Sequence, residues 1–290
     1  MTTGTPEAAA ADRRVVYVYG VARAPRGRQF APPRFEGIVP QAPVHPLMHA
    51  DLLAFVSAVP ACQFGASEFR SSLNHAQWLK DRILAHEKVL EALRSSYDVV
   101  PFRFGTIYLD CSQAASALAR HRAELCQALD RIRGASEWGV KLYCDRDALH
   151  RRIEAASGSL RPLREMLERA SPGARFFLQK KYVRAVDDEA ATTIAACVEL
   201  IRRSLDRCAC ESTEIDVQPA AVHGRSADMV LNAAYLVPER RLGPFRQMVA
   251  ALHEEFAAHG FDQELTGPWP PYHFVSVRQE GTADAATSDR

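Results

Sequence analysis

The sequence lacks an excess of charge of either sign, because 36 lysines and arginines are balanced by 35 aspartates and glutamates. A strongly basic domain is the usual electrostatic footprint of a protein that binds nucleic acid. The sequence also lacks an apolar run of the roughly 18 residues that a membrane-spanning helix requires. Composition therefore argues against nucleic acid and membrane as partners.

Cysteine is scarce and odd in number, with seven residues scattered through the 290-residue chain. This usage predicts free thiols in a reducing cytoplasm and no structural disulfide. Residues 1–12 have neither a basic start nor a long apolar core, so we expect no signal peptide. We predict a cytoplasmic globular protein, and its length favours two domains.

Complete metal-binding motifs are also missing. A zinc-hydrolase helix needs His-Glu-x-x-His, because side chains four residues apart share one face of a helix. His86-Glu87 and His253-Glu254 begin this pattern, but Leu90 and Ala257 stand where the second histidine is required. The sequence therefore predicts no zinc site of this kind.

Other ligand motifs are equally incomplete. Cys208-Ala-Cys210 has no second cysteine pair. His75 and His86 lie on similar sides of a predicted helix but about 16 Å apart by helix rise, too far to share one ion. No glycine-rich loop of the kind that cradles phosphate is found. We expect no metal and no cofactor.

Three further groups leave alternatives open. Ser67 is better explained as a helix N-cap than as a nucleophile. Asp145 and Asp147 close a predicted strand, where they are either a catalytic carboxylate pair or helix-capping residues. The arginines at positions 23, 26, 28 and 34 could hold an anion or belong to a solvated loop. An enzyme or small-molecule sensor built on a ferredoxin-like sheet is therefore the alternative to a binding protein.

The segment Thr266–Phe274 contains three prolines, one glycine and three aromatic residues. Proline fixes φ, lacks an N–H donor and biases the preceding residue toward extended geometry. We therefore predict a rigid extended strap that leads into a last strand over 272–277. We expect Trp269 to pack against the sheet; the alternative is an anchor that faces a partner.

Hydrophobic periodicity predicts an α+β protein with two domains. We expect a disordered tail over 1–12, an α+β domain over 13–134, a second α+β domain over 135–279 and a flexible tail over 280–290. The second domain is predicted to be ferredoxin-like, a βαββαβ unit with a helical insertion after its first strand. The expected strands are 14–21, 99–108, 138–144, 213–221, 229–237 and 263–277, and the expected helices are 48–58, 67–95, 112–133, 147–156, 160–170, 187–208 and 241–259.

Several stretches of sequence together resemble the gas vesicle protein F/L family. They are Val16–Gly20, the helix with Trp78 and His86-Glu87, Val100–Thr106, Glu137–Tyr143, Val230–Val237 and Leu265–Phe274. The resemblance runs from Val15 to about Val277, and the strap is its most specific part. The residues we select as partner-binding or architectural are Phe104, Thr106, Trp138, Trp269, Tyr272 and Phe274.

This resemblance implies an accessory protein for building gas vesicles, whose wall is a polymer of a small and very apolar subunit. Exposed strand edges and large apolar patches template nonspecific association. A dedicated partner that binds the wall protein by strand addition or apolar capture would suppress such aggregation. The resemblance thus implies a non-enzymatic assembly factor or minor structural component, with the wall protein and other accessory proteins as partners.

Overall fold

The computed structural model describes residues 13–25 and 35–275. The chain forms two compact units, one of Met1–Ala135 with Trp269–Arg290 and one of Ser136–Pro268. The sequence assigned 135–279 to the second domain, whereas the chain rejoins the first unit at Trp269. The predicted tails over 1–12 and 280–290 lie outside the described residues.

The sheet of the first unit is built around β1 (Arg14–Arg23), whose β-branched and aromatic residues are buried almost throughout. The strand order is β2-β3-β1-β4, and β5 also pairs with β1. The β1–β3 register shifts between Val18 and Gly20. A side chain at Gly20 would lie 2.8 Å from the carbonyl oxygen of Val100, so glycine is required there. The remaining strands are β2 (His45–His49), β3 (Leu52–Pro60), β4 (Val100–Pro101) and β5 (Ile107–Tyr108).

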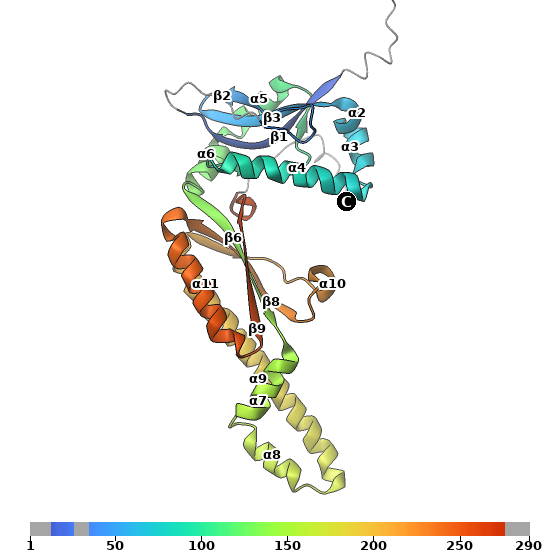
Figure 1. The fold of residues 1–290 in the computed structure, drawn as a ribbon, viewed down its shortest axis with the longest axis vertical. Helices are drawn as coiled ribbons and strands as arrows, with labels where there is room; N and C mark the ends of the chain where they lie inside the picture. The colour runs from blue at the N-terminus through green and yellow to red at the C-terminus, as the bar shows by residue number, and fades with distance from the viewer. Residues whose placement is uncertain (1–12, 26–34, 276–290) are drawn as a thin grey trace, which may run out of the picture. The chain divides into compact units, whose positions relative to one another are not determined.

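Helices cover both faces of this sheet (Figure 1). Tyr17 and Tyr19 of β1 share a core with Leu90 and Leu93 of α4, whereas Val18, which points to the opposite face, lies beside α5. The helices of this unit are α2 (Ala61–Phe64), α3 (Ala66–Ser72), α4 (Ala76–Arg94), α5 (Cys111–Arg120) and α6 (Arg122–Arg131).

Several predictions for the first unit are wrong in detail. The helix expected over 48–58 is the end of β2 followed by β3, because a short apolar run buried on both faces has no decisive period. The helix expected over 67–95 is interrupted between α3 and α4, and the one expected over 112–133 is interrupted at His121. Gly65, not Ser67, is the N-cap of α3. The strand expected over 99–108 is two short strands separated by a turn in which Gly105 has φ 87°.

The second unit contains a four-stranded sheet with the order β7-β8-β6-β9. Side chains from β6 and β8 form one core with α9 and α11, including Val140, Leu231, Ile201 and Phe245. The strands are β6 (Ala135–Cys144), β7 (Glu211–Glu214), β8 (Asp228–Pro238) and β9 (Phe261–Trp269). The helices are α7 (Arg146–Ala156), α8 (Arg161–Glu168), α9 (Pro172–Asp206), α10 (Ala220–His223), the short 3-10 helix η1 (Glu239–Arg241) and α11 (Leu242–Ala257).

The elements of the second unit follow the predicted order, but three boundaries differ. Helix α9 begins at Pro172, well before the predicted start at 187. Strand β7 ends at Glu214, and part of the predicted strand 213–221 is the short helix α10. Strand β9 ends at Trp269, and Tyr272–Phe274 forms the 3-10 helix η2 instead of a last strand. The prolines at 270 and 271 have no N–H to donate to a sheet, which accounts for this end.

Candidate functional site

The strap meets the first unit at a cluster of aromatic rings around His86. The His86 ring stacks on Tyr19 at a centroid distance of 5.7 Å and meets Tyr17 edge-on at the same distance. The Phe104 ring meets the His86 ring edge-on, with 6.0 Å between the ring centroids. Tyr272 of η2 packs against the same core. The C-terminal strap is thus tied to β1 and α4.

A chain of hydrogen bonds runs through this cluster. The backbone N–H of Gly105 donates to the Tyr17 hydroxyl (3.1 Å), which lies 2.9 Å from Nδ1 of His86. Nε2 of His86 lies 3.3 Å from the Tyr272 hydroxyl, which donates to Oε1 of Glu87 at 2.9 Å. Each donor in this series of hydrogen bonds has an acceptor when His86 is neutral and carries its proton on Nε2. Tyr17 then donates to Nδ1, and Nε2 donates to Tyr272.

Burial sets the protonation of these groups. Desolvation lowers the pKa of His86 to about 4, although a hydrogen bond to the backbone of Phe102 opposes the change. Burial raises the pKa of Tyr17 well above its usual value. Burial also raises the pKa of Glu87, against the effect of the Tyr272 hydrogen bond. The neutral His86 imidazole lies between the hydroxyl groups of Tyr17 and Tyr272. We call this hydrogen-bonded set of His86, Tyr17, Tyr272 and Glu87 the lock, because it holds the strap in place.

This lock predicts a loss of stability in acid. Because the folded-state pKa of His86 is about 4 and its ordinary value is 6.5, the unfolded chain takes up a proton first as the pH falls between these values. The folding free energy lost should reach about 3 kcal/mol by pH 4. The raised pKa of Glu87 acts with the opposite sign. Chemical denaturation of the wild type and of His86→Gln, which cannot titrate there, should give curves that converge toward pH 4. Parallel curves would contradict the lock.

The structure places four of the six residues selected from the sequence in packed or buried positions of the first unit. Phe104 and Tyr272 pack on the same core. Thr106 is buried and donates from Oγ1 to the Arg103 carbonyl oxygen at 2.8 Å. Phe274 is buried, with 2% of its surface exposed. Thr106 and Phe274 are buried, whereas Phe104 and Tyr272 are partly buried, and this packing favours an architectural role for the four residues.

The two tryptophans of that set lie elsewhere. Trp138 is buried in the core of the second unit, with the Arg246 guanidinium 4.7 Å from its ring centroid. Trp269 stands at the end of β9 with 48% of its surface exposed. This exposure does not suit the expectation that Trp269 packs against the sheet as a buried ring, and it favours the alternative of an anchor that faces a partner.

The residues considered for chemistry have structural partners. Asp145 caps α7 by accepting from the backbone N–H of Ala148 at 2.9 Å. Asp147 is exposed beside it, at a cavity of about 290 Å3. Cys144 also lines this cavity, but burial raises the pKa of its thiol to about 11, which makes it a poor nucleophile. Helix capping accounts for Asp145 without catalysis.

Arg23 belongs to an ion-pair cluster. Its guanidinium lies 2.8 Å from Asp51 and 3.1 Å from Asp130, and Asp51 is also paired with Arg122 at 2.7 Å. Two carboxylates therefore already neutralise this arginine, which does not suit an open anion site. Arg26, Arg28 and Arg34 lie outside the described residues.

Residues 13–25 and 35–275 contain neither a metal-binding cluster nor a membrane-spanning helix. No three histidine, cysteine, aspartate or glutamate side chains there gather closely enough to hold a metal ion. No helix there has the length and apolar character needed to cross a membrane. All seven cysteines are free thiols.

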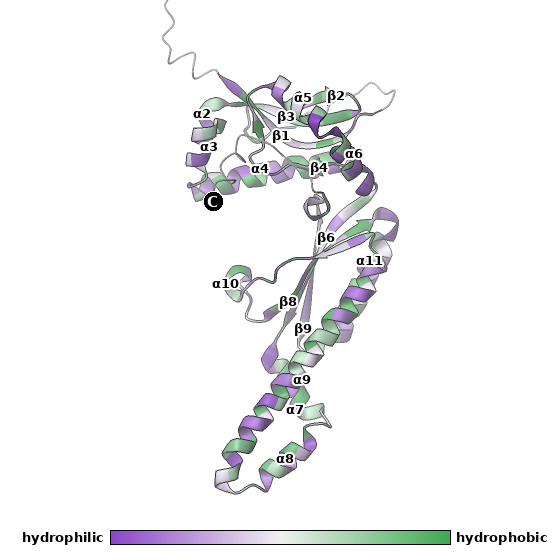
Figure 2. Cartoon of the chain, turned by 180° about the vertical axis from the view of Figure 1, so that it is seen from behind, coloured by the Kyte–Doolittle hydropathy of each residue, from purple (hydrophilic) through white to green (hydrophobic). Residues whose placement is uncertain are grey.

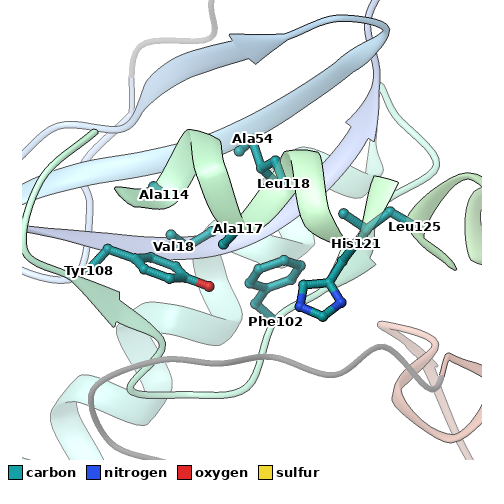
Figure 3. A pocket seen from close by; sticks show the side chains of 9 residues that line it. All are labelled: Val18, Ala54, Phe102, Tyr108, Ala114, Ala117, Leu118, His121 and Leu125. Carbon is teal, nitrogen blue, oxygen red and sulfur yellow. The ribbon is translucent and has the colours of Figure 1, made fainter. Parts of the chain in front are cut away.

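A small apolar cavity lies between α5 and the sheet (Figure 3). Figure 3 shows Ala114, Ala117 and Leu118 of α5 facing Val18 and Ala54 of the strands. Its volume is about 10 Å3, which is close to the smallest space that holds one water molecule. This cavity is a packing gap and too small for a ligand.

Sequence reasoning missed the main contacts of the site. His86-Glu87 begins a zinc motif and belongs to the family resemblance, but neither pattern predicts that these two side chains hold the strap through Tyr272. The available signal was a histidine on the apolar face of an amphipathic helix, which more often marks a buried, hydrogen-bonded side chain than a metal ligand.

Comparison with known proteins identifies the family of this chain. The family model "Gas vesicle synthesis protein GvpL/GvpF" matches residues 15–276. Gas vesicle protein L of Streptomyces sp. (strain CB03234) is 30% identical over 284 residues, which cover 96% of this chain and 98% of that protein. Gas vesicle protein F of the same strain is 27% identical over 263 residues, 89% of this chain and 98% of that protein.

Solved structures show the same fold. The crystal structure of GvpF from Anabaena sp. PCC7120 matches with a TM-score of 0.68 at 19% identity and covers 91% of this chain and 99% of that one. GvpF from Microcystis aeruginosa matches with a TM-score of 0.60, also at 19% identity, covering 90% and 99%. The mixed helix and sheet architecture with two antiparallel sheets is thus shared with GvpF. With the family model matching nearly the whole described chain, this protein belongs to the GvpL/GvpF family of gas vesicle synthesis proteins.

Proposed function

We propose that this protein is a non-catalytic assembly factor or minor structural component of gas vesicles that binds the apolar wall protein during nucleation or shell growth. Membership of the GvpL/GvpF family is the observation that carries the proposal. It acts in the cytoplasm, in association with gas vesicles and their other accessory proteins. Catalysis, a metal and a cofactor have no part in this role.

The strap supplies a surface suited to this partner. Trp269 is exposed at the end of β9, while Tyr272 and Phe274 fix the chain just beyond it to the first unit. An aromatic ring on a restrained backbone loses little conformational entropy on binding. Tryptophan is also enriched among the residues that dominate interface energies. Trp269 is therefore our candidate contact for the wall protein.

We further propose that the second unit is a ferredoxin-like domain with α7–α9 as an extended crossover. The order of its strands in the chain is β6, β7, β8 and β9, and their order in the sheet is β7-β8-β6-β9. Such a sheet leaves β7 and β9 as its edges, and an edge is a place for strand addition by an apolar partner.

Wall-protein binding at apolar surface should depend only weakly on salt. Exposed ion pairs are screened above ~0.1 M salt, whereas apolar burial is not. Pull-down of purified wall protein by the full chain should therefore be nearly unchanged between ~0.1 and ~0.5 M NaCl. Release of the wall protein over this range would instead assign the contact to charged residues and contradict apolar capture.

A further inference from the structure

The second unit carries a helical arm, residues 161–184, which comprises α8 and the first part of α9. Within this unit, the arm extends beyond the end of the sheet (Figure 1). No residue of α8 is buried, and the first buried residue of α9 is Val186. The arm nevertheless exposes large apolar side chains, with Phe176 at 59% and Phe177 at 73%. Adjacent exposed phenylalanines indicate an interaction surface.

The same arm is strongly basic. It contains seven lysines and arginines against two glutamates, a net charge of +5, whereas the whole chain carries +1. Arg161 is paired with Glu165 at 3.3 Å. In the described part of the chain, no carboxylate forms an ion pair with Arg169, Arg175, Lys181 or Arg184. The arm therefore combines exposed apolar surface with positive charge that the unit itself does not neutralise.

Apolar and basic side chains are interleaved on the arm. Phe176, Lys180 and Val183 follow helical spacing on one face of α9, and the Lys180 ammonium lies 4.7 Å from the Phe176 ring centroid. Figure 2 shows hydrophobic and hydrophilic residues alternating along this part of α9. A helix that lies on a membrane separates its apolar and basic residues onto opposite faces. Mixing them on one face favours a protein surface that is itself both apolar and charged.

A groove beside the arm has matching chemistry. It lies between α7, α8 and α9 and has a volume of about 430 Å3. Arg151 and Arg164 give its lining two positive charges against the one carboxylate of Glu154, and Leu167 and Tyr182 supply apolar surface. An amphipathic helix binds such a groove through its apolar side chains, and acidic residues on its flanks would meet the unpaired arginines and lysines.

We propose that the helical arm binds an acidic amphipathic helix of a partner protein. This site lies in a different unit from the lock at His86 and does not rest on the proposed capture of the wall protein. The two interactions also differ in their physical basis: the arm uses charge complementarity, which gives strong dependence on salt, whereas wall-protein capture uses apolar burial.

The test uses the full-length protein and a fluorescein-labelled peptide of about 20 residues, with leucines at helical spacing and glutamates elsewhere. Fluorescence anisotropy should show saturable binding that weakens as NaCl increases. The pair F176A/F177A and the pair R175E/K181E should each weaken binding about tenfold or more. The exposed pair K80E/K88E on α4 makes the same charge change as R175E/K181E and should bind as the wild type does.

Other outcomes would overturn the proposal. Absence of peptide binding, or equal binding of a peptide with lysines in place of the glutamates, excludes recognition of an acidic helix. The protein could instead bind vesicles of phosphatidylcholine and phosphatidylserine and fail to bind the peptide. If F176A/F177A abolishes that vesicle binding, the arm binds a membrane surface. A dimer of the protein that F176A/F177A dissociates assigns the arm to a second copy of the chain.

Discussion

Replacing Phe274 with alanine should destabilise the first unit by about 3–5 kcal/mol, because the change removes a large buried aromatic ring and leaves a cavity. Only 2% of the Phe274 surface is exposed, although the residue lies near the end of the described chain. Differential scanning calorimetry should show a lower melting temperature for the transition of the first unit. The transition of the second unit, Ser136–Pro268, should stay unchanged.

Phe274→Leu provides the matched control, since it keeps an apolar side chain and should cost clearly less than the alanine change. A melting temperature for Phe274→Ala within the error of the wild-type value would show that the strap is not held by this ring. The account of Trp269–Phe274 as a fixed part of the first unit would then be wrong.

Replacing Trp269 with alanine should leave the stability of the protein nearly unchanged and weaken its binding to the wall protein. With 48% of its surface exposed, this ring contributes less to folding than a buried aromatic does, and the melting temperature should stay close to that of the wild type. Affinity for the wall protein should fall about tenfold or more if Trp269 is an interface anchor. Trp269→Phe, which keeps an aromatic ring, should restore part of the affinity.

Calorimetry and a wall-protein pull-down on Trp269→Ala separate these possibilities. A large loss of stability would show that the ring is a packing element after all. Normal stability with normal capture would remove Trp269 from the binding surface and leave the sheet edges as the candidate contact.

Local chemistry explains which elements the sequence could predict. Strands β1, β6 and β8 were expected because β-branched and aromatic residues dominate them. The helix that the sequence predicts over 48–58 is wrong, because a nearly continuous apolar run fits a strand buried on both faces as well as a helix. The local sequence pattern does not distinguish a helix from a buried strand here. Pairing of β3 with both β1 and β2 makes the segment a strand.

The candidate site was beyond sequence reasoning for a different reason. Tyr272 and His86 are 186 residues apart in the chain, and no local pattern indicates that their side chains meet. The prolines of the strap correctly excluded an α-helix, but they could not show that the chain rejoins the first unit at Trp269 and turns at Tyr272. Burial of Phe274 and exposure of Trp269 depend on that return.

The most direct test of the central claim is coexpression of this chain with the wall protein from the same organism, followed by size-exclusion chromatography with light scattering. We expect wall protein in the soluble fraction to elute together with this chain in a complex of defined mass, and wall protein expressed alone to be insoluble. Wall protein of equal solubility with and without this chain, and no coelution, would contradict the account.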